Sequence, residues 1–291
     1  MRFKMTAAVL AVAAVLACST MTMASTNPVG TAAMMDIGMG ARALGMGGAN
    51  IAVADDGAAI YYNPAGLGLM QRRCLTSLYT SQFRAANYMA VGYSQRNIGV
   101  GLLRLDASGI EETDEFANVT GVFGVADLTA VAGGGFEVIP NLSLGGALKY
   151  YYQSLPASSG WGITGDVGAL WTPMPWMSVG VVGRNLLGSV KYKDGESDPF
   201  ERSFGLGVAF RPMKGLLLAA DAVYQNQATL KAGAEYQFGP VALRAGGSWG
   251  AGQTSLTAGA GFSVQVLSID YSYQTHSILP DSHRISISAR F

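Results

Sequence analysis

Apolar and polar residues alternate with a period of two along most of the chain from residue 75 onward. Near the end, Leu267, Ile269 and Tyr271 alternate with serine and aspartate, and the final segment repeats the scheme with Ile285 and Ile287. This period places successive side chains on opposite faces, which is the pattern of a β-strand with one apolar face. The sequence therefore predicts an all-β protein.

Fourteen alternating segments follow the glycine-rich start of the chain. They are residues 75–83, 86–95, 97–105, 127–138, 141–152, 161–171, 175–184, 201–211, 214–224, 227–238, 240–249, 254–264, 266–275 and 282–291. An antiparallel bacterial barrel needs an even number of strands. The segments near 86 and 97 alternate weakly, and without them the count falls to twelve.

The connections between these segments differ on alternate sides. Those after even-numbered segments are short and mostly marked by proline or asparagine, whereas those after odd-numbered segments include polar loops at 106–126, 154–160, 185–200 and 276–281. Outer-membrane barrels have short turns at one end and longer loops at the other. The connections therefore favour a membrane barrel over a soluble sandwich.

The polar face of the segments is a second difference from a soluble sandwich, whose strands also alternate. A sandwich turns its polar face to water and fills it with lysine and glutamate. Here that face carries glycine, serine, threonine and isolated charges, namely Asp166, Asp221, Lys231, Arg244 and Asp270. Aromatic residues lie toward the strand ends, as in the girdles of membrane barrels. We predict a transmembrane antiparallel β-barrel over residues 74–291 with a polar lumen.

Composition agrees with this fold. Charged residues make up 13% of the chain, against roughly 25% in an average soluble domain, while 49% of residues are hydrophobic. No segment after residue 24 is long and apolar enough for an ordinary transmembrane helix. The formal net charge is zero, which gives no electrostatic reason to expect nucleic acid as a partner.

The first residues have the features of a signal peptide. A positively charged start precedes an apolar run at 7–17, and Ala24 ends a stretch of small residues suited to signal peptidase. The run is too short to cross a bilayer as a helix, so we expect export and removal of residues 1–24. A poor lipobox ends at Cys18 and leaves lipidation as an alternative. Cys74 is the only other cysteine, so no disulfide is expected in the exported chain.

Residues 25–73 do not alternate and are rich in small residues. The glycines within 45–48 allow tight turns with positive φ, and Asn63 followed by Pro64 starts a turn. Asp56 and the aspartate before it are placed to cap a short helix that begins near residue 57. A fourteen-stranded barrel has a lumen wide enough to need filling. We therefore expect this segment to enter the lumen as a hatch.

The stretch GARALGMGGANIAVADDGAAIYYNPAGLG, residues 40–68, resembles the N-terminal signature of PorV/PorQ-type proteins, within the wider FadL superfamily of outer-membrane barrels. The signature positions of the hatch are Gly40, Arg42, Gly45, Gly47, Gly48, Asp55, Asp56, Asn63, Pro64 and Gly66. FadL-like proteins have fourteen-stranded barrels with an N-terminal hatch and admit hydrophobic molecules. PorV-like proteins act in type IX secretion, where the barrel receives folded cargo.

The chain ends in Phe291 after an alternating segment, which resembles the signal that the barrel-assembly machinery reads. The expected partners are therefore this machinery, outer-membrane lipid, and either a hydrophobic small molecule or secreted protein cargo. Passage of hydrophobic or amphipathic small molecules across the cell outer membrane is the function we favour. A scaffold that docks exported proteins is the alternative, and the hatch argues against a general ion-conducting porin.

Catalytic chemistry finds little support in the sequence. His276 and His283 flank a predicted outer loop that contains Asp281, an arrangement that could serve a barrel hydrolase, although a solvated loop explains it more simply. The acidic run at 111–115 could gather calcium, but such runs are more often solvated. No nucleophile and base stand at a meaningful spacing. We predict a non-enzyme without a cofactor or metal.

Overall fold

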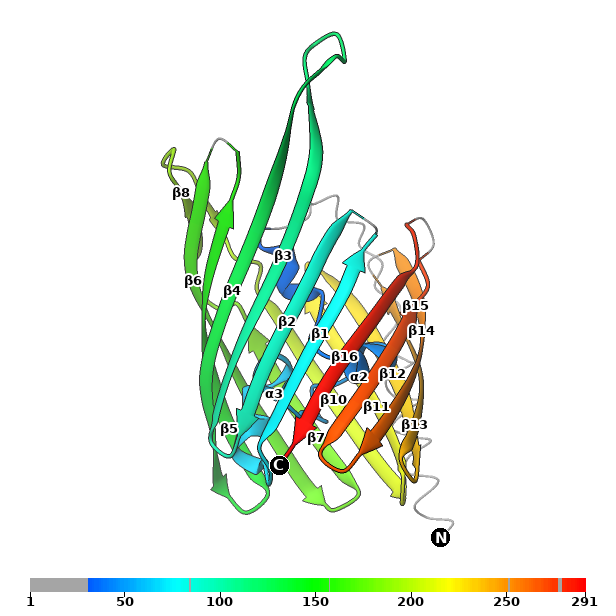
Figure 1. The fold of residues 1–291 in the computed structure, drawn as a ribbon. Helices are drawn as coiled ribbons and strands as arrows, with labels where there is room; N and C mark the ends of the chain where they lie inside the picture. The colour runs from blue at the N-terminus through cyan, green and yellow to red at the C-terminus, as the bar shows by residue number, and fades with distance from the viewer. Residues whose placement is uncertain (1–30, 84, 157, 251, 277–278) are drawn as a thin grey trace.

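The computed structural model describes residues 31–83, 85–156, 158–250, 252–276 and 279–291 (Figure 1). The predicted signal peptide, residues 1–24, lies outside the described residues, as do Cys18 and the start of the predicted hatch. In the described part of the chain, fourteen strands form a barrel and two short strands lie on its rim.

The barrel strands are β1 (Cys74–Gln82), β2 (Ala86–Gln95), β3 (Ile98–Thr113), β4 (Val119–Ile139), β5 (Leu142–Ser154), β6 (Ser159–Met174), β7 (Met177–Arg184), β10 (Ser203–Met213), β11 (Leu216–Gln225), β12 (Gln227–Phe238), β13 (Val241–Gly250), β14 (Gln253–Val264), β15 (Leu267–Gln274) and β16 (Ser282–Arg290). The rim hairpin consists of β8 (Ser189–Tyr192) and β9 (Ser197–Pro199). Four short helices precede β1: η1 (Ala33–Asp36), α2 (Ala41–Gly45), α3 (Ala59–Tyr62) and η2 (Pro64–Leu69).

Backbone hydrogen bonds close the barrel. Each barrel strand pairs antiparallel with the barrel strands before and after it, and β1 pairs with β16 in a register that sets Leu75 opposite Ala289. Within a bilayer an unpaired backbone group finds no water, so a sheet can span it only when closed. The prediction of fourteen antiparallel strands is confirmed, and both weakly alternating segments belong to strands, β2 and β3.

The two ends of the barrel have different connections. At one end, here called the turn end, six connections of two residues each join the strands: 96–97, 140–141, 175–176, 214–215, 239–240 and 265–266. The longer connections all lie at the opposite end, here called the loop end. The predicted asymmetry between short turns and long loops is confirmed.

The predicted polar loop at 106–126 is a regular hairpin over most of its length. β3 and β4 continue past the barrel as a projecting hairpin (Figure 1), in which Ile110 pairs with Phe123. This stretch does not alternate with a period of two, so its strands were not predicted, whereas ladder hydrogen bonds join backbone groups whatever the side chains are. The predicted loop at 185–200 likewise contains a regular hairpin, β8 and β9.

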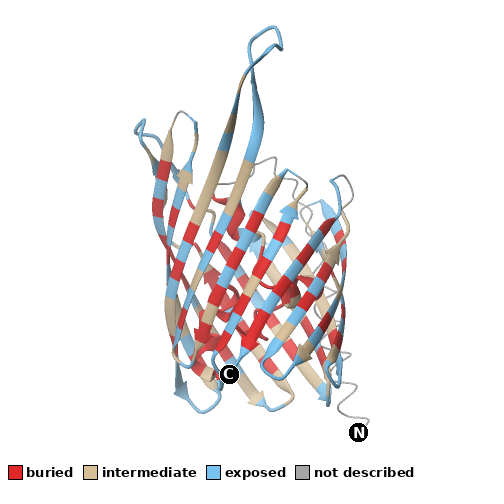
Figure 2. Ribbon diagram, in the orientation of Figure 1, coloured by how far each residue is buried: buried red, intermediate tan, exposed pale blue. Residues whose placement is uncertain are grey.

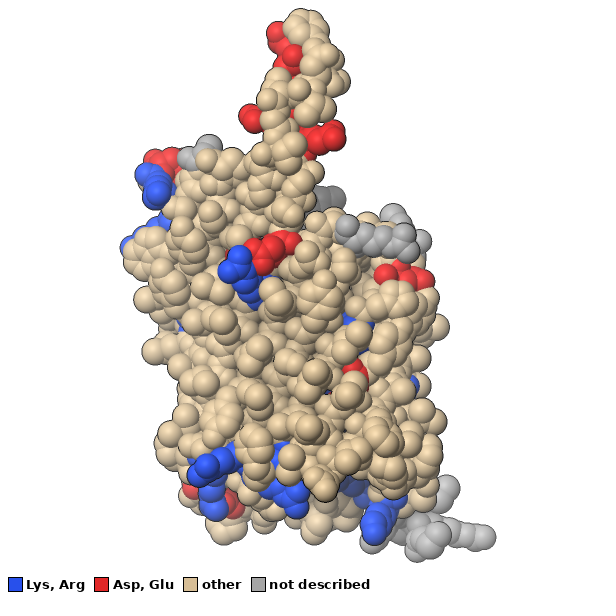
Figure 3. All heavy atoms as spheres, viewed as in Figure 1, with Lys and Arg blue, Asp and Glu red and all other residues tan. Residues whose placement is uncertain are grey.

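The outward face of the barrel is an apolar belt. Exposed and buried residues alternate along the strands (Figure 2), and charged side chains gather toward the two ends on the face shown in Figure 3. Exposed aromatic residues lie toward the loop end at Tyr79, Trp161, Tyr224 and Tyr271 and toward the turn end at Phe136, Trp171, Phe238 and Phe262. An apolar band with aromatic borders is the lipid-facing surface of a membrane barrel.

The lumen contains most of residues 31–73, the described part of the predicted hatch, which we call the inner segment (Figure 1). Its Ala41 N–H donates to Ser286 Oγ of β16 at 2.6 Å, and its Asn63 side chain donates to the Ala169 carbonyl of β6 at 3.1 Å. β16 and β6 lie on opposite sides of the barrel, so a segment bonded to both must cross the lumen. No helix among the described residues has the length and hydropathy to cross a membrane.

Glycines allow the inner segment to touch the backbone of the wall. A Cβ atom added at Gly246 of β13 would lie 2.5 Å from the backbone nitrogen of Gly47, and Gly47 itself has a φ of 68° that side chains rarely adopt. Only glycine permits both the conformation and the close approach. Glycine therefore allows the backbone of the inner segment to pack directly against the backbone of the wall.

Replacing Gly246 with alanine tests this contact. We expect Gly246→Ala to lower the free energy of unfolding by about 1–3 kcal/mol, the usual cost of overpacking, because the added methyl group meets backbone rather than a flexible side chain. Urea-induced unfolding of the chain in lipid vesicles measures it. The control is Gly146→Ala in β5, where the nearest atom lies 3.6 Å from the new Cβ. Equal losses in both variants would contradict the proposed packing.

Candidate functional site

Arg42 of α2 is the centre of a polar network near the turn end. Its guanidinium donates to both carboxylate oxygens of Glu235 on β12 at 2.9 Å and to Asp55 at 2.6 Å. Glu235 also accepts from Arg244 of β13 at 2.7 Å, and Arg244 donates to Asp270 of β15 at 2.7 Å. Bidentate and charge-assisted hydrogen bonds of this kind are among the strongest in proteins. The network ties the inner segment to three strands of the wall.

Asp55 is the half-exposed end of this network. Burial raises the pKa of its carboxyl group, but the Arg42 guanidinium, with smaller contributions from Arg290 and Arg211, more than offsets that effect and holds the pKa below its ordinary value. A carboxyl group with a lowered pKa stabilises the fold above its unfolded pKa of about 3.9 and loses that contribution as pH falls through the folded pKa. The contact is therefore complete at neutral pH and weakens only in strong acid.

Other signature residues shape the chain around this network. Asp56 lies 3.3 Å from Arg42 and accepts from the Ala58 N–H at 2.9 Å in the turn before α3. The prediction that Asp55 and Asp56 cap a helix near residue 57 is wrong, because α3 begins at Ala59 and has no side-chain cap. Asn63 Oδ1 accepts from Ala65 N–H at 3.1 Å and caps η2, which begins at Pro64. This cap satisfies a backbone donor that a short helix leaves free.

The signature glycines have two different uses. Gly47 and Gly48 adopt positive φ, as predicted for turn positions, and Gly40 also does so. The same prediction for Gly45 is wrong, because Gly45 ends α2; a Cβ there would instead approach the wall at Gly259 and Arg244. A Cβ on Gly66 would lie 2.7 Å from the Ala54 side chain, so that glycine is required for packing inside the segment.

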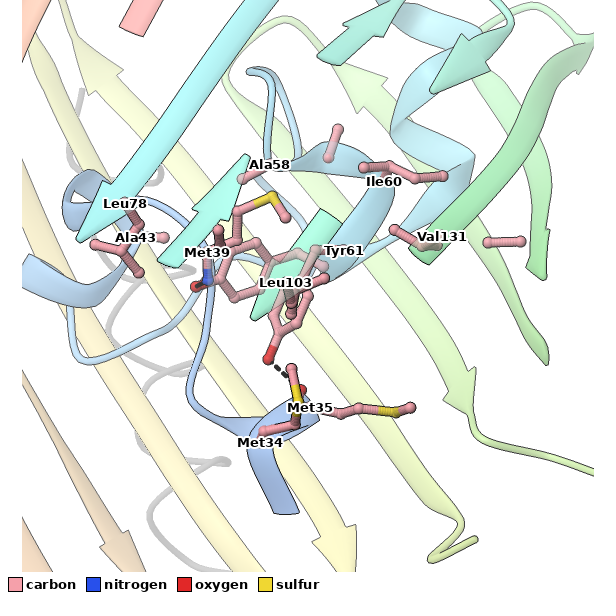
Figure 4. Packing of buried hydrophobic residues seen from close by; sticks show 14 of the residues in the cluster. Met34, Met35, Met39, Ala43, Ala58, Ile60, Tyr61, Leu78, Leu103 and Val131 are labelled. Atoms are coloured by element: carbon pink, nitrogen blue, oxygen red, sulfur yellow. Dashed lines mark hydrogen bonds between the residues drawn. The ribbon is translucent and has the colours of Figure 1, made fainter. Parts of the chain in front are cut away.

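An apolar cluster lies on the other side of the inner segment, toward the loop end. Met34, Met35 and Met39 pack with Tyr61 and with side chains from the strands (Figure 4). The Tyr61 hydroxyl donates to the Met35 carbonyl at 2.5 Å, so its polar tip is satisfied within the cluster. Methionine is flexible and fills irregular space. This part of the lumen is therefore apolar and can adapt its shape.

The apolar cluster continues upward onto the projecting hairpin. Leu103 and Val131 belong to the cluster and face the lumen. Because side chains alternate, Val125 and Phe123 of β4 lie on the same face as Val131, and Phe123 stands opposite Ile110 of β3. We call this face, from Ile110 and Phe123 down to Leu103 and Val131, the apolar track. On β4 it is interrupted by Asp127 and Thr129, and it is continuous on β3 through Leu105 and Ala107. It leads from the tip region of the hairpin into the lumen.

The cavity under α2 is polar and small. It measures about 50 Å³ and is lined by charged and hydroxyl side chains that include Arg42, Arg244, Arg290 and Asp270. Sites for drug-sized apolar molecules measure roughly 300–1,000 Å³ and are mostly apolar. This cavity suits water molecules rather than an apolar ligand.

Two groups of lumen residues could not be identified from the sequence alone. Alternation places Glu235 on the lumen face, but nothing in the sequence pairs it with Arg42, because that pairing depends on the path of the inner segment. Met34, Met39 and Tyr61 carry no periodic signal, since they lie on or between single-turn helices that are too short to show a period. An excess of methionine and tyrosine in a segment otherwise made of glycine and alanine was the available hint.

The rim residues considered for hydrolysis do not form a catalytic arrangement. His276 Nε2 lies 3.2 Å from Ser282 Oγ, but Ser282 is fully buried, and Asp281 accepts from the backbone N–H of His276 rather than from its ring. His283 Nδ1 bonds to the Tyr271 hydroxyl at 2.7 Å. Within the described ranges, no three His, Cys, Asp or Glu side chains gather as a metal site.

The end of the chain completes the seam of the barrel. Phe291 and Arg73 exchange two backbone hydrogen bonds of 3.0 Å, which extend the ladder between β1 and β16. The Phe291 side chain is exposed. Cys74, at the start of β1, is free and buried.

Removing Arg42 is expected to loosen the inner segment. In Arg42→Gln, Glu235 keeps only Arg244, and the carboxylates of the inner segment lose their main partner, so we expect the free energy of unfolding to fall by about 3–5 kcal/mol. Arg211→Gln is the control, because Arg211 is partly exposed and lies 3.5 Å from Asp55; a loss below about 1 kcal/mol is expected there. Urea unfolding measures both, and a common midpoint would show that the Arg42 network does not hold the segment.

Comparison with known proteins shows similarity in fold to solved structures. No protein-family model matches the sequence, and no curated protein matches it. Among solved structures, the chain is similar to CymD, a monoaromatic hydrocarbon channel, with a TM-score of 0.60 and 15% identity over 87% of this chain and 97% of CymD. It is similar to the Pseudomonas putida toluene transporter TodX, with a TM-score of 0.59 and 14% identity over 87% of this chain and 96% of TodX.

A FadL homologue from Pseudomonas aeruginosa gives the same result, with a TM-score of 0.60 and 14% identity over 87% of this chain and 98% of the homologue. The three similarities extend over nearly the whole of each neighbour. They therefore involve the complete barrel and not only part of the sheet. At such identities the likeness concerns the fold. The chain has the fold of the FadL-like channels.

Proposed function

We propose that this chain is an outer-membrane channel of the PorV/PorQ type, among the FadL-like barrels, that passes hydrophobic or amphipathic small molecules. The observation that carries the proposal is the apolar track, which joins the projecting hairpin to the apolar cluster in the lumen. An apolar path of this kind is costly to keep in contact with water. It is explained if apolar molecules follow it.

Capture is the first step of the proposed passage. The loop end faces the cell exterior, as in outer-membrane barrels with long outer loops, so the hairpin with Phe123 and Ile110 meets molecules outside the cell. An apolar molecule that contacts this face leaves water, and further contacts along Val125 and Leu103 draw it into the lumen. The methionines of the cluster can rearrange to admit it.

Passage through the inner segment is the second step. The inner segment acts as a hatch in this proposal, and the Arg42–Glu235 contact anchors it at the turn end. Because α2 and α3 are single turns joined by glycine-rich chain, the segment can shift as small units rather than unfold as a whole. The apolar molecule then leaves past the segment toward the periplasm or the lipid.

Several further features support the proposed channel function. The predicted signal peptide, residues 1–24, and the terminal Phe291 fit export and assembly into the outer membrane, and the apolar belt fits contact with lipid. The signature from Gly40 to Gly66 supports the PorV/PorQ type. Of the structural neighbours, two are hydrocarbon channels and one of these is a toluene transporter, which agrees with an apolar cargo for this chain.

A docking barrel of type IX secretion is the second candidate, and the projecting hairpin is the observation that favours it. Beyond Asp106 of β3 and Ala126 of β4, the hairpin pairs with no further strand. Unpaired strand edges are surfaces to which another chain can add. Under this alternative the hairpin receives exported protein, and loss of the chain leaves apolar uptake unchanged while cargo fails to reach the cell surface.

Substitutions on the two faces of the hairpin separate these functions. We expect Phe123→Asp to lower the uptake of the apolar dye N-phenyl-1-naphthylamine about fivefold in cells carrying the protein, the effect of losing about 1 kcal/mol of apolar contact. Val122→Asp is the matched control, because Val122 lies next to Phe123 but on the opposite face, and its uptake should equal that of the unaltered chain. Equal loss in both variants would reject the apolar track as the route.

Conductance tests the state of the lumen. In planar bilayers the full chain is expected to show no large steady conductance, because the inner segment fills the lumen and is bonded to opposite walls. A variant without residues 31–70 exposes the polar wall and is expected to conduct steadily. A difference in gel migration between the unheated and the heated variant verifies that the barrel is folded. Similar conductance from both proteins would favour a general porin.

A further inference from the structure

Four arginines meet at the turn end of the seam, where β1 joins β16. Arg72 and Arg73 directly precede β1. Arg290 stands opposite Cys74 in the β1–β16 register, and Arg96 lies in the turn that follows β2. All four arginines are exposed, and on the face that carries these strands Lys and Arg atoms gather along the turn-end rim (Figure 3). This part of the rim is therefore a cationic surface.

Carboxylates offset only part of this charge. Glu137 approaches Arg96 at 3.8 Å, the carboxylate at the end of this chain adds one more negative charge, and Asp55 is already bonded within the polar network of α2. In the part of the chain that the structure describes, no salt bridge reaches Arg72 or Arg73. Like charges on neighbouring strands destabilise a sheet, so a partner with negative charge would stabilise the seam.

Arg73 projects from the lipid-facing side of the barrel. It exchanges two backbone hydrogen bonds of 3.0 Å with Phe291, so it continues β1 by one residue and its side chain shares a face with Leu75. Leu75 is 39% exposed and Phe291 is 60% exposed, and both belong to the apolar belt. The Arg73 guanidinium therefore lies at the border between the apolar belt and the turn-end rim.

A hydrogen-bond donor from β2 lies beside Arg73. The register sets Tyr93 opposite Leu75, and two residues further toward the turn end it brings Gln95 next to Arg73. The Tyr93 hydroxyl donates to Gln95 Oε1 at 2.9 Å. Among the described residues no hydrogen bond uses the Gln95 Nε2 group, so this group is available to donate. Guanidinium and amide groups both donate to oxygen, and here the two stand side by side at the edge of the apolar belt.

We infer that Arg73, with Arg72 and Gln95, binds the phosphate of an anionic phospholipid in the leaflet at the turn end. A guanidinium matches phosphate oxygens through two parallel hydrogen bonds. The positive charge of this rim favours a head group with a net negative charge over phosphatidylcholine, in which a choline cation balances the phosphate. Basic side chains near a membrane surface are attracted to anionic lipid in this way.

The position of the arginines favours lipid over a protein as the partner. Leu75 and Ile98 are exposed residues of the apolar belt, and they follow Arg73 and Arg96 by two residues, or about 7 Å along a strand. Arginine can lay its methylene groups along apolar surface while the guanidinium reaches the head groups. The cationic surface is thus continuous with the surface that lipid covers. The inference concerns the outer wall and does not depend on what passes through the lumen.

Retention of lipid by the purified protein tests the site. The full chain in detergent is offered equal amounts of phosphatidylglycerol and phosphatidylcholine with the same acyl chains, and native mass spectrometry counts the bound molecules. We expect phosphatidylglycerol to be preferred about twentyfold. Arg72→Gln and Arg73→Gln should each lower the preference about fivefold, the effect of one basic residue near anionic lipid. Arg73→Lys, which keeps the charge, should retain most of the preference.

A matched variant removes two cations from the opposite end of the barrel. Lys191 and Lys193 are exposed residues of the rim hairpin at the loop end, so Lys191→Gln/Lys193→Gln should leave the lipid preference unchanged. Arg72→Gln/Arg73→Gln removes the same number of charges and should abolish the preference. A difference in gel migration between unheated and heated protein verifies that every variant is folded.

Unfolding separates the lipid site from a structural role of the arginines. Urea midpoints are compared in vesicles of phosphatidylcholine alone and in vesicles in which about one-third of the lipid is phosphatidylglycerol. The unaltered chain should unfold at higher urea in the anionic vesicles, whereas Arg72→Gln/Arg73→Gln should show no such rise. In phosphatidylcholine alone this double variant should be at least as stable as the unaltered chain, because it relieves repulsion at the seam.

Three results would overturn the lipid site. They are equal retention of both lipids by the unaltered chain, a preference that survives Arg72→Gln/Arg73→Gln, and a preference lost equally in Lys191→Gln/Lys193→Gln. Binding of polyglutamate, a model acidic protein, without any lipid preference would also overturn it and would assign the surface to protein docking. Dye uptake is measured separately, so each of these results leaves the proposed passage of apolar molecules intact.

Discussion

The need to pair every backbone hydrogen-bonding group within lipid is the constraint on which this structure depends. A sheet in a bilayer cannot leave an edge unpaired, so β1 must meet β16 and the strands must close. Closure of fourteen strands encloses a wide lumen, and that lumen creates a second requirement, because it must be filled or left open to water. The polar wall, the glycine contacts and the inner segment all follow from this second requirement.

The inner segment fills the lumen through close backbone contacts with the wall rather than through a large apolar core. Glycine faces glycine where Gly47 approaches Gly246, and charged groups pair where side chains meet, as at Arg42 and Glu235. Such contacts are specific in direction, so they fix one path through the lumen. They also depend on few atoms each, and under the proposed function this allows the segment to shift without loss of the barrel.

Buried charged side chains in the lumen have two different environments. Near the turn end, arginine and carboxylate side chains form a closed network in which each buried charge has a partner. Nearer the loop end, Arg284 is equally buried, and among the described residues its Nε and Nη1 groups have no hydrogen-bond partner. Hydrogen-bonded charges are tolerated inside a protein, whereas an unsatisfied one costs free energy.

The sequence by itself determined the number of strands, their antiparallel order and the side on which the short turns lie, because period-two alternation and turn residues are local properties of the chain. It also placed Asp221, Arg244 and Asp270 on the lumen face for the same reason. It did not show that residues 106–126 form a strand hairpin, since strands outside lipid need not alternate strictly. Only the tertiary structure decided that Arg42 meets Glu235 and that Met34, Met35 and Met39 gather toward the loop end. Those contacts join residues far apart in the chain, and their geometry follows from how an irregular segment fits a closed wall.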